Sequence, residues 1–487
     1  MTLSLFFSRF SGEEKRLYAG AVILRILLFF FLLAYLGVAK FLEIKGGTSP
    51  LYLKFADNIL SGHGFGINGI LESKKTPGYP LYLALFQLLR LPFWGAVLVQ
   101  IGLFSLMGVY AMRMVRLLGF GKGAQRMAGI LAAFEPLQLF YSVTLMPDSL
   151  TALFFFMGVY YLMRFWYEEG RQDLWFAAVL FALANYFRPI TIAFSFLLPL
   201  FIFVMAGLVK KKWARGFKQG LFFGVVFFAL VAPWMARNYI QFRSFTFSSG
   251  GAAYVLYFSG SAVFAAEQHV PFYQAYDKLY AQIQPQLPDP ADQFSIRNTA
   301  FLQKKAAEII FSHLRTYLKL YLFALQTFFI SGNYHFLLYD LGFIRGPSQG
   351  QISYTGLFAG QGIGAVLGRL PGFISEPYGM IALLGRVFLG AIFLASLAGA
   401  WRVFRKSKYG SFPALLYVLC LVYGALTVAT AVEGIEARHR LFLNPLIFVF
   451  AAAGFWAFQS AQKKKASVLL SGGQKQTKIM PELMEDL

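Results

Sequence analysis

The stretch FLEIKGGTSPLYLKFADNILSGHGFGINGILESKKTPGYP, residues 41–80, separates two hydrophobic runs near the start of the chain. Its charged side chains are Glu43, Lys45, Lys54, Asp57, Glu72, Lys74 and Lys75. Charges at this density are too costly in hydrocarbon, so the stretch must lie at a membrane surface or line a wet cavity. We interpret it as the first wall of a functional site.

The composition places the chain among polytopic membrane proteins. Of its 487 residues, 58% are hydrophobic and 14% are charged, which is more apolar than soluble domains require. The formal charge is +22, but the positive residues cluster in short segments between hydrophobic runs, and a basic groove with interleaved aromatic residues is absent. We therefore expect membrane lipids, and no nucleic acid, as partners. The single cysteine, Cys420, lies in an apolar run and is expected to fill the core.

Apolar runs that approach the length needed to cross a bilayer, about 20 residues, predict an all-α fold with about ten to twelve transmembrane helices. They lie near 17–39, 93–112, 127–145, 149–165, 174–187, 190–209, 219–236, 379–401, 412–432 and 441–459. A further run at 316–331 fits either a span that returns after residue 355 or an interfacial helix that never crosses. The first run lacks a small-residue cleavage site after it, so we expect an uncleaved helix.

These runs divide the chain into an N-terminal transmembrane module, an outer region, C-terminal helices and a tail, at 1–236, 237–375, 376–462 and 463–487. Basic loops near Arg113, Lys210 and Arg402 are assigned to the cytoplasm by the positive-inside rule, and both termini fall on that side of the cytoplasmic membrane. The first outer loop then covers 40–92. It should hold two interfacial helices, at 49–60 and 77–89, and the outer region an amphipathic helix near 294–313.

Most polar residues at apolar boundaries fall on the outer side in this topology. Asp148 follows Pro147 at the start of an apolar run, either as a helix cap or as a carboxylate presented at the outer surface. Lys75 either anchors lipid headgroups or binds a phosphate. Arg188 lies between two apolar runs, where an unpaired ion would be costly, so we expect it to be paired or functional.

Further polar side chains gather at two more outer ends of apolar runs: Arg237, Asn238, Glu436, Arg438, His439 and Arg440. Together with Lys75 and Arg188, these arginines would form a cationic cavity suited to a lipid-linked phosphate. Asp57 lies on the helical stretch YLKFADNILSG and is either a solvated residue or a functional acid. The histidines show no metal-ligand spacing.

The chain resembles the polyprenyl-phosphate-sugar-dependent glycosyltransferases of the GT-C superfamily, through six blocks in this order: YLKFADNILSGHGF, KTPGYPLYLALFQLL, LFYSVTLMPDSL, NYFRPI, PWMARNYIQFRSFTFSS and EARHRLFLNP. The most similar members are the family 39-like bacterial enzymes, related to protein O-mannosyltransferases and lipid A aminoarabinose transferases. The resemblance covers residues 1–260 and 433–446. It implies a GT-C fold and transfer of a sugar, with inversion, from a polyprenyl-phosphate donor to a glycan, lipid or protein acceptor at the outer face.

The resemblance also implies roles for individual residues. Lys75 matches a lysine that binds the donor phosphate, and the basic residues in matching blocks would stabilise the departing phosphate: Arg188, Arg237, Arg438 and Arg440. Asp148 matches an acidic position, and in some relatives such a residue binds a divalent cation. Acceptor binding or support is expected of Tyr52, Tyr79, Asn238, Glu436 and His439.

The sequence departs from the family pattern before Tyr52. Relatives carry an acid a few residues before this tyrosine, where the acceptor hydroxyl is activated, but residues 47–51 read GTSPL. Asp57 or Glu43 is then the substitute, beside Asp148, for the general base. Two other functions remain open, namely a lipid-linked saccharide flippase and a catalytically silent lipid-binding subunit. Charges spread through the membrane midplane would favour the flippase, whereas the missing acid favours the silent subunit.

Overall fold

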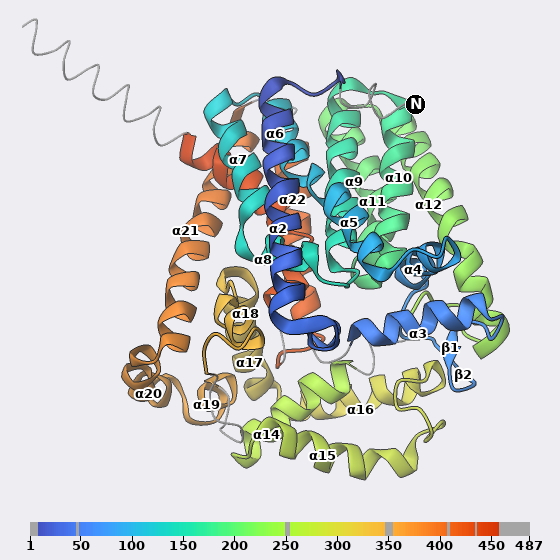
Figure 1. The fold of residues 1–487 in the computed structure, drawn as a ribbon, viewed down its shortest axis with the longest axis vertical. Coiled ribbons are helices and arrows are strands. Elements are labelled where there is room, and N and C mark those ends of the chain that lie inside the picture. Colours follow the sequence, from blue (N-terminus) through green and yellow to red (C-terminus); the bar gives the residue numbers. More distant parts are fainter. Residues whose placement is uncertain are drawn as a thin grey trace, which may run out of the picture.

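The computed structural model describes residues 8–44, 48–248, 254–345, 354–406, 410–433 and 436–456, so the basic tail expected at 463–487 lies outside it. Within this part of the chain, seven helical segments are long and apolar enough to cross a membrane. They are α2 (Gly12–Glu43), α5 and α6 (Phe93–Phe104 and Leu106–Leu117), α9 (Asp148–Glu168), η1 with α11 (Pro189–Thr191 and Ile192–Lys210), α12 (Trp213–Phe242), α21 (Pro377–Lys406) and α22 (Ser411–Val428). They stand side by side as a bundle (Figure 1).

Shorter helices complete the bundle: α7 (Lys122–Phe134), α8 (Pro136–Val143), α10 (Arg171–Phe187), α17 (Leu314–Ile330) and the helix Asn444–Trp456. Helix α10 packs along both α9 and α12. The predicted all-α polytopic membrane fold is therefore confirmed. Ten to twelve crossings would require some of these shorter helices to cross as well, so that count stays a prediction.

The run at 127–145 is broken, and the prediction of one continuous helix there is wrong. The carboxylate of Glu135 accepts a hydrogen bond from the backbone N–H of Gln138 at 3.0 Å and caps α8, whose first turn holds Pro136. Proline has no N–H with which to continue the hydrogen-bond ladder of α7. The chain turns at this point, and α8 leads on towards Asp148.

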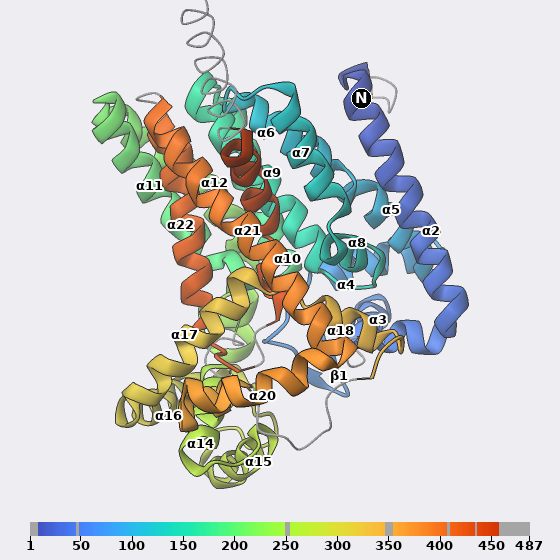
Figure 2. The same ribbon diagram turned by 90° about the vertical axis from the view of Figure 1, so that its left-hand side faces the viewer.

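Short elements lie across one end of the bundle (Figure 2). The first outer loop contains α3 (Thr48–Leu60), the hairpin of β1 (Gly66–Ile67) and β2 (Ile70–Leu71), and α4 (Gly78–Leu88). The strands are antiparallel and pair Gly66 with Leu71 and Ile67 with Ile70. Both helices predicted in this loop are present.

The outer region forms a small helical layer beyond the first loop. Its elements are η2 (Val255–Gly260), α14 (Ser261–Gln268), α15 (Phe272–Ile283), η3 (Gln284–Gln286), η4 (Ile296–Asn298) and α16 (Thr299–Ser312). It has a hydrophobic cluster of its own, which includes Leu256, Leu279 and Leu302. The amphipathic helix predicted near 294–313 is α16.

After α17 the chain forms α18 (Tyr334–Asp340), α19 (Tyr354–Gln361) and α20 (Ile363–Ser375). Helix α20 lies across the end of α21 (Figure 2). None of these three helices has the length of a span. Within the described residues, the run at 316–331 is therefore followed by short helices and not by a returning span.

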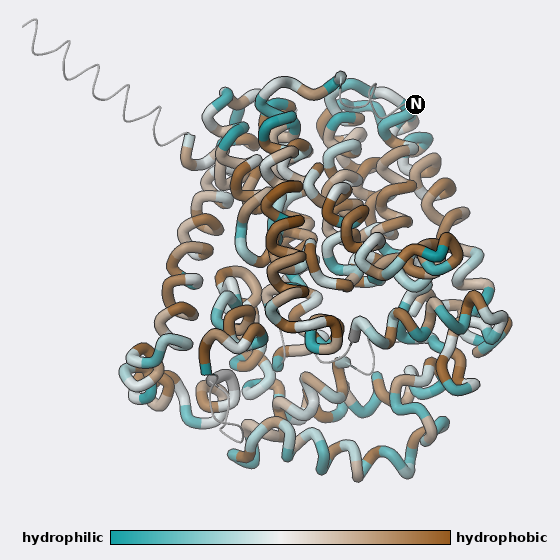
Figure 3. Tube along the Cα trace, viewed as in Figure 1, coloured by the Kyte–Doolittle hydropathy of each residue, from teal (hydrophilic) through white to brown (hydrophobic). Residues whose placement is uncertain are grey.

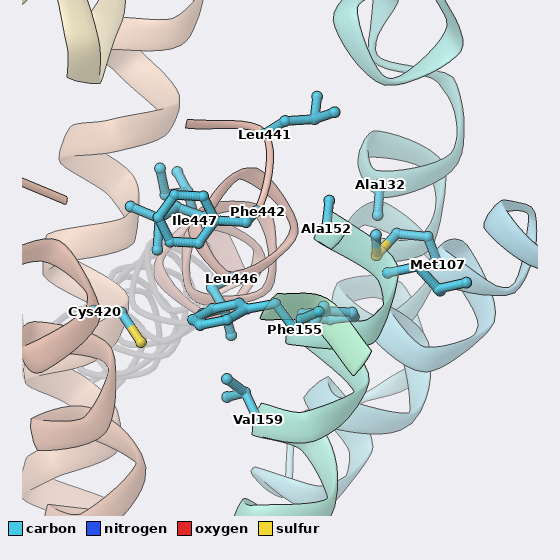
Figure 4. Close-up of a cluster of buried hydrophobic side chains, with 14 of the residues drawn as sticks. Met107, Ala132, Ala152, Phe155, Val159, Cys420, Leu441, Phe442, Leu446 and Ile447 are labelled. Carbon is cyan, nitrogen blue, oxygen red and sulfur yellow. The ribbon is translucent and has the colours of Figure 1, made fainter. Parts of the chain in front are cut away.

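The long helices are apolar, and hydrophilic residues gather at the two ends of the bundle (Figure 3). Figure 4 shows Phe155 of α9 next to Phe442 and Leu446, with the rings of Phe155 and Phe442 5.0 Å apart and edge to face. Cys420 is fully buried in this cluster, as expected of a core residue.

Close backbone contact joins α21 to the helix Asn444–Trp456. A Cβ atom on Gly399 would meet the carbonyl oxygen of Phe450, and a Cβ on Gly454 would meet that of Ala395. In lipid there is no hydrophobic driving force between helices. Small residues such as these glycines promote helix association because they allow close packing.

Candidate active site

An ion pair joins the buried carboxylate of Asp148 to the partly exposed guanidinium of Arg188 at the end of the bundle that carries α3 and α4. Asp148 begins α9, so its carboxylate lies at the positive end of a helix dipole. Arg188 follows the last residue of α10 in an extended conformation (φ −154°), as expected before a proline. Its guanidinium donates to Oδ1 of Asp148. Oδ2 is buried and has no hydrogen-bond partner among the described residues, so the carboxylate is oriented and keeps one oxygen open.

The loop that carries Lys75 is held from several sides. Oε1 of Glu72 accepts hydrogen bonds from the backbone N–H groups of Lys74 and Lys75, at 2.6 and 3.1 Å, and Ser248 Oγ donates to the carbonyl of Lys74 at 2.7 Å. A Cβ on Gly78 would lie 2.5 Å from the carbonyl oxygen of Tyr186. The glycine therefore lets the start of α4 touch the last turn of α10, which leads directly to Arg188.

Lys75 is a half-buried cation that forms no ion pair with a carboxylate among the described residues. Its ammonium lies 5.1 Å from the ring centroid of Tyr52. Burial lowers the pKa of Lys75, and the neighbouring cations Lys74 and Arg188 lower it further. An anion bound at this position would relieve that electrostatic cost.

The outer layer closes over the loop through Lys74. The Lys74 ammonium lies 3.4 Å from the ring centroid of Phe294 and 4.9 Å from that of Tyr254. Burial raises the pKa of Tyr254, but Lys74, Arg188 and Lys75 together outweigh burial and lower it. Tyr254 therefore faces the same group of cations. Sequence reasoning missed it, since the only signal in the outer region is its aromatic content.

Arg438 is a further cation near Asp148. Its Nε lies 3.3 Å from Oε2 of Glu436. Burial opposes the charge of Arg438, but Glu436, Tyr141 and Asp148 raise its pKa. His439 accepts the backbone N–H of Glu436 through Nδ1 at 3.1 Å and shapes this short turn, the 3-10 helix η6 (Ala437–Arg440). The structure thus pairs Arg188 with Asp148 and brings Arg438 and Lys75 within electrostatic range of this pair, and we refer to Lys75, Arg188 and Arg438 as the cationic group.

Arg237 and Arg440 are used differently. Arg237 donates to the carbonyls of Glu72 and Phe65, at 2.9 and 3.2 Å, and so supports the first outer loop from α12. Arg440 is fully buried and donates to the carbonyls of Phe328 and Ser331.

Two further predicted residues are placed by the structure. Asn238 is buried and donates to the carbonyls of Thr246 and Phe247, at 2.8 and 3.3 Å, which fixes the turn after α12. Glu43, at the end of α2, is exposed. Asn238 therefore has a supporting position, and within the described residues neither side chain forms a hydrogen bond or ion pair with Asp148.

Asp57 does not join the cationic group. It is exposed on α3 and its Oδ1 accepts a hydrogen bond from Nε2 of Gln87 at 2.7 Å. It lines an open groove of about 450 Å³ with Lys54, His63 and the β1–β2 hairpin. A second groove, of about 570 Å³, lies between the α6–α7 loop and the last residues of α21, away from Asp148.

The donor set around Asp148 does not fit a divalent metal ion. Hard divalent cations take several oxygen ligands, commonly from more than one carboxylate. Asp148 is a single carboxylate, already paired with Arg188 and electrostatically coupled to Arg438. Within the described ranges, no group of three or more His, Cys, Asp or Glu side chains could hold a metal.

The fold and this site define a multispanning membrane protein with a buried carboxylate and three cations at one end of its helices. Residues 74–236, about a third of the chain, match the model of a family described as dolichyl-phosphate-mannose-protein mannosyltransferase. The match supports a GT-C type membrane glycosyltransferase similar to mannosyltransferases. No curated protein matches the chain.

Proposed function

We propose that this protein transfers a sugar, with inversion, from a polyprenyl-phosphate donor to an acceptor hydroxyl at the extracytoplasmic face of the cytoplasmic membrane. The observation that carries the proposal is the meeting of a buried, oriented carboxylate at Asp148 with the cationic group Lys75, Arg188 and Arg438. The match of residues 74–236 to a family named for a lipid-phosphate-linked mannose supports the same class of donor.

In this mechanism the acceptor hydroxyl attacks the anomeric carbon from the side opposite the phosphate. The new glycosidic C–O bond forms while the C–O bond to the phosphate breaks, and its electron pair goes to the phosphate oxygen. Oδ2 of Asp148 receives the hydroxyl proton, because Arg188 already occupies Oδ1. The products are a glycoside and the polyprenyl phosphate.

The cationic group would stabilise the leaving phosphate. Fixed cations aimed at developing negative charge are most effective where water is excluded, and they cost no reorganisation during the reaction. Lys75 and Arg438 are half-buried. Within the described residues, neither forms an ion pair with the carboxylate of Asp148. We assign phosphate binding to Lys75, Arg438 and Arg188. Arg237 and Arg440 would support the site through their hydrogen bonds to backbone carbonyls.

The distribution of charge supports the proposed side of the membrane. The ends of α6, α11 and α21, which carry the basic loops, lie at the end of the bundle opposite α3 and α4 (Figure 1). Arg113 and Arg116 there bind Glu14 at the start of α2, at 3.0 and 2.5 Å. The positive-inside rule favours a cytoplasmic location for this end, so the site would face outward.

The test is transfer from a radiolabelled polyprenyl-phosphate sugar in membranes that contain the protein. We expect label in a glycan, lipid or protein fraction, and loss of that label in Arg188→Ala with the protein still folded. Full turnover in Arg188→Ala would discard its role at the phosphate.

A silent lipid-binding subunit is the second candidate, favoured by the described residues Ser49, Pro50 and Leu51, which provide no carboxylate before Tyr52. It predicts that purified protein binds polyprenyl phosphate but transfers no sugar under any donor and acceptor supplied.

A further inference from the structure

A fully buried amide connects two parts of the proposed site. Gln100 lies in α5 and is fully buried. Its Nε2 donates to the carbonyls of Ser142 and Thr144, at 3.1 and 2.8 Å, and its Oε1 accepts the hydroxyl hydrogen of Tyr79 at 3.2 Å. Gln100 therefore bridges α4 to the last turn of α8 and to the segment between α8 and Asp148.

The Tyr79 side of this bridge reaches the cationic group. The rings of Tyr79 and Tyr52 meet edge to face with centroids 5.2 Å apart, and the ammonium of Lys75 lies over Tyr52. Tyr79 itself is fully buried. Contacts between buried or half-buried side chains thus run from Lys75 through Tyr52 and Tyr79 to Gln100.

The other side of the bridge reaches the carboxylate. Ser142 is held from two sides. Its carbonyl accepts a hydrogen bond from Gln100, and its Oγ accepts one from Nε of the buried Arg25 at 2.9 Å. Ser142 lies in the last turn of α8, residues 144–147 connect α8 to α9, and Asp148 is the first residue of α9. Fixing the carbonyls of Ser142 and Thr144 therefore fixes the start of α9.

We propose that Gln100 is a positioning residue, which sets the spacing between the Lys75 loop and Asp148 by joining Tyr79 to the carbonyls of Ser142 and Thr144. The kinetic part of this inference rests on the proposed function. Reacting groups must be held close to their productive geometry, and a displacement of about 1 Å by a distant substitution can cost about a hundredfold in rate.

The chain offers a matched control on the same helix. Tyr82 is also a tyrosine of α4, and its hydroxyl donates to the carbonyl of Ala96 at 2.6 Å. Tyr79→Phe and Tyr82→Phe each delete one hydroxyl and one hydrogen bond between α4 and α5 and keep the ring. Only Tyr79→Phe cuts the bridge to the Asp148 segment.

The experiment measures kcat, the Kd for polyprenyl phosphate, and hydrogen exchange of residues 142–148 in both variants and in Gln100→Leu. We expect Tyr79→Phe to lower kcat about tenfold with Kd within about twofold of wild type, and to speed exchange in 142–148. Tyr82→Phe should change neither kcat nor this exchange. Gln100→Leu should exceed Tyr79→Phe in both effects, because it also removes the hydrogen bonds that Nε2 donates to the carbonyls of Ser142 and Thr144.

Equal kcat and equal exchange in the two tyrosine variants would overturn the proposal, as would a loss of activity explained entirely by a weaker Kd. Hydrogen exchange needs no turnover, so it tests the bridge even if the wild type transfers no sugar. In that event the proposed function fails, and faster exchange in Tyr79→Phe alone still supports the positioning of Asp148 by Gln100.

Discussion

Replacing Arg188 with alanine should destabilise the protein, because the carboxylate of Asp148 would stay buried without its cation. Removing one partner of a fully buried ion pair costs about 3–5 kcal/mol. The side chain of Asp148 is 2% exposed but that of Arg188 is 26% exposed, so solvent already screens part of the pair. We therefore expect a loss of about 2–3 kcal/mol in the free energy of unfolding.

The pair can be separated from other effects by a double-mutant cycle with Asp148→Asn. Removing both charges removes the unpaired carboxylate, so Arg188→Ala combined with Asp148→Asn should cost about 1–2 kcal/mol less than the sum of the single variants. The assay is equilibrium unfolding in detergent micelles, followed by tryptophan fluorescence.

A second ion pair in the same chain provides the control. Arg126 and Glu13 lie 2.5 Å apart at the other end of the bundle, with side chains 59% and 30% exposed. Such a solvent-exposed pair should show little or no coupling. Additive losses at Asp148 and Arg188, or a coupling no larger than that of the control pair, would refute the buried ion pair on which the oriented carboxylate depends.

The remaining predictions concern the loop that carries Lys75 and the start of α4. Burial and neighbouring cations lower the pKa of Lys75, so its ammonium should lose its proton at a pH below the ordinary lysine pKa of about 10.4. The KM for the donor should rise with pH in that range. Lys75→Arg keeps its charge at that pH and should abolish this rise; a wild-type pH profile in this variant would contradict the phosphate role. Gly78→Ala should lower both thermal stability and transfer, since its Cβ would press on the carbonyl of Tyr186, at a cost of about 1–3 kcal/mol. Gly364→Ala, where a Cβ meets nothing, is the control, and equal effects of the two alanines would disprove the close contact.

The sequence predicted the long apolar helices and the two helices of the first loop, because the hydrocarbon core imposes long apolar runs and excludes dense charge. It did not reveal the break at Glu135. Proline is tolerated within apolar membrane runs, so Pro136 alone is no signal of a break. The carboxylate that caps α8 becomes visible only once the helices are placed.

The candidate site was predicted in part. Topology alone placed Asp148, Arg188, Lys75 and Arg438 at the outer ends of apolar runs, and the structure gathers them. Arg237 also lies at the predicted outer end of an apolar run, but its guanidinium donates hydrogen bonds to backbone carbonyls. The direction in which a side chain points depends on packing, which the sequence pattern does not contain.

Gln100 had no signal of its own in the sequence. A lone amide within the apolar run FWGAVLVQIGLF is compatible with a lipid-facing, a helix-facing or a functional position. Its role depends on Tyr79, Ser142 and Thr144, which are distant in the chain and meet only in the folded bundle.

The most direct test of the central claim compares Asp148→Asn with Asp57→Asn in sugar transfer from a labelled polyprenyl-phosphate donor. The loss of a general base lowers kcat by about 10²–10⁴-fold, and we predict such a loss for Asp148→Asn with binding of polyprenyl phosphate retained. Asp57 is exposed and bonded to Gln87, so Asp57→Asn should keep kcat within about twofold of wild type. Full activity in Asp148→Asn, or the larger loss in Asp57→Asn, would contradict Asp148 as the base.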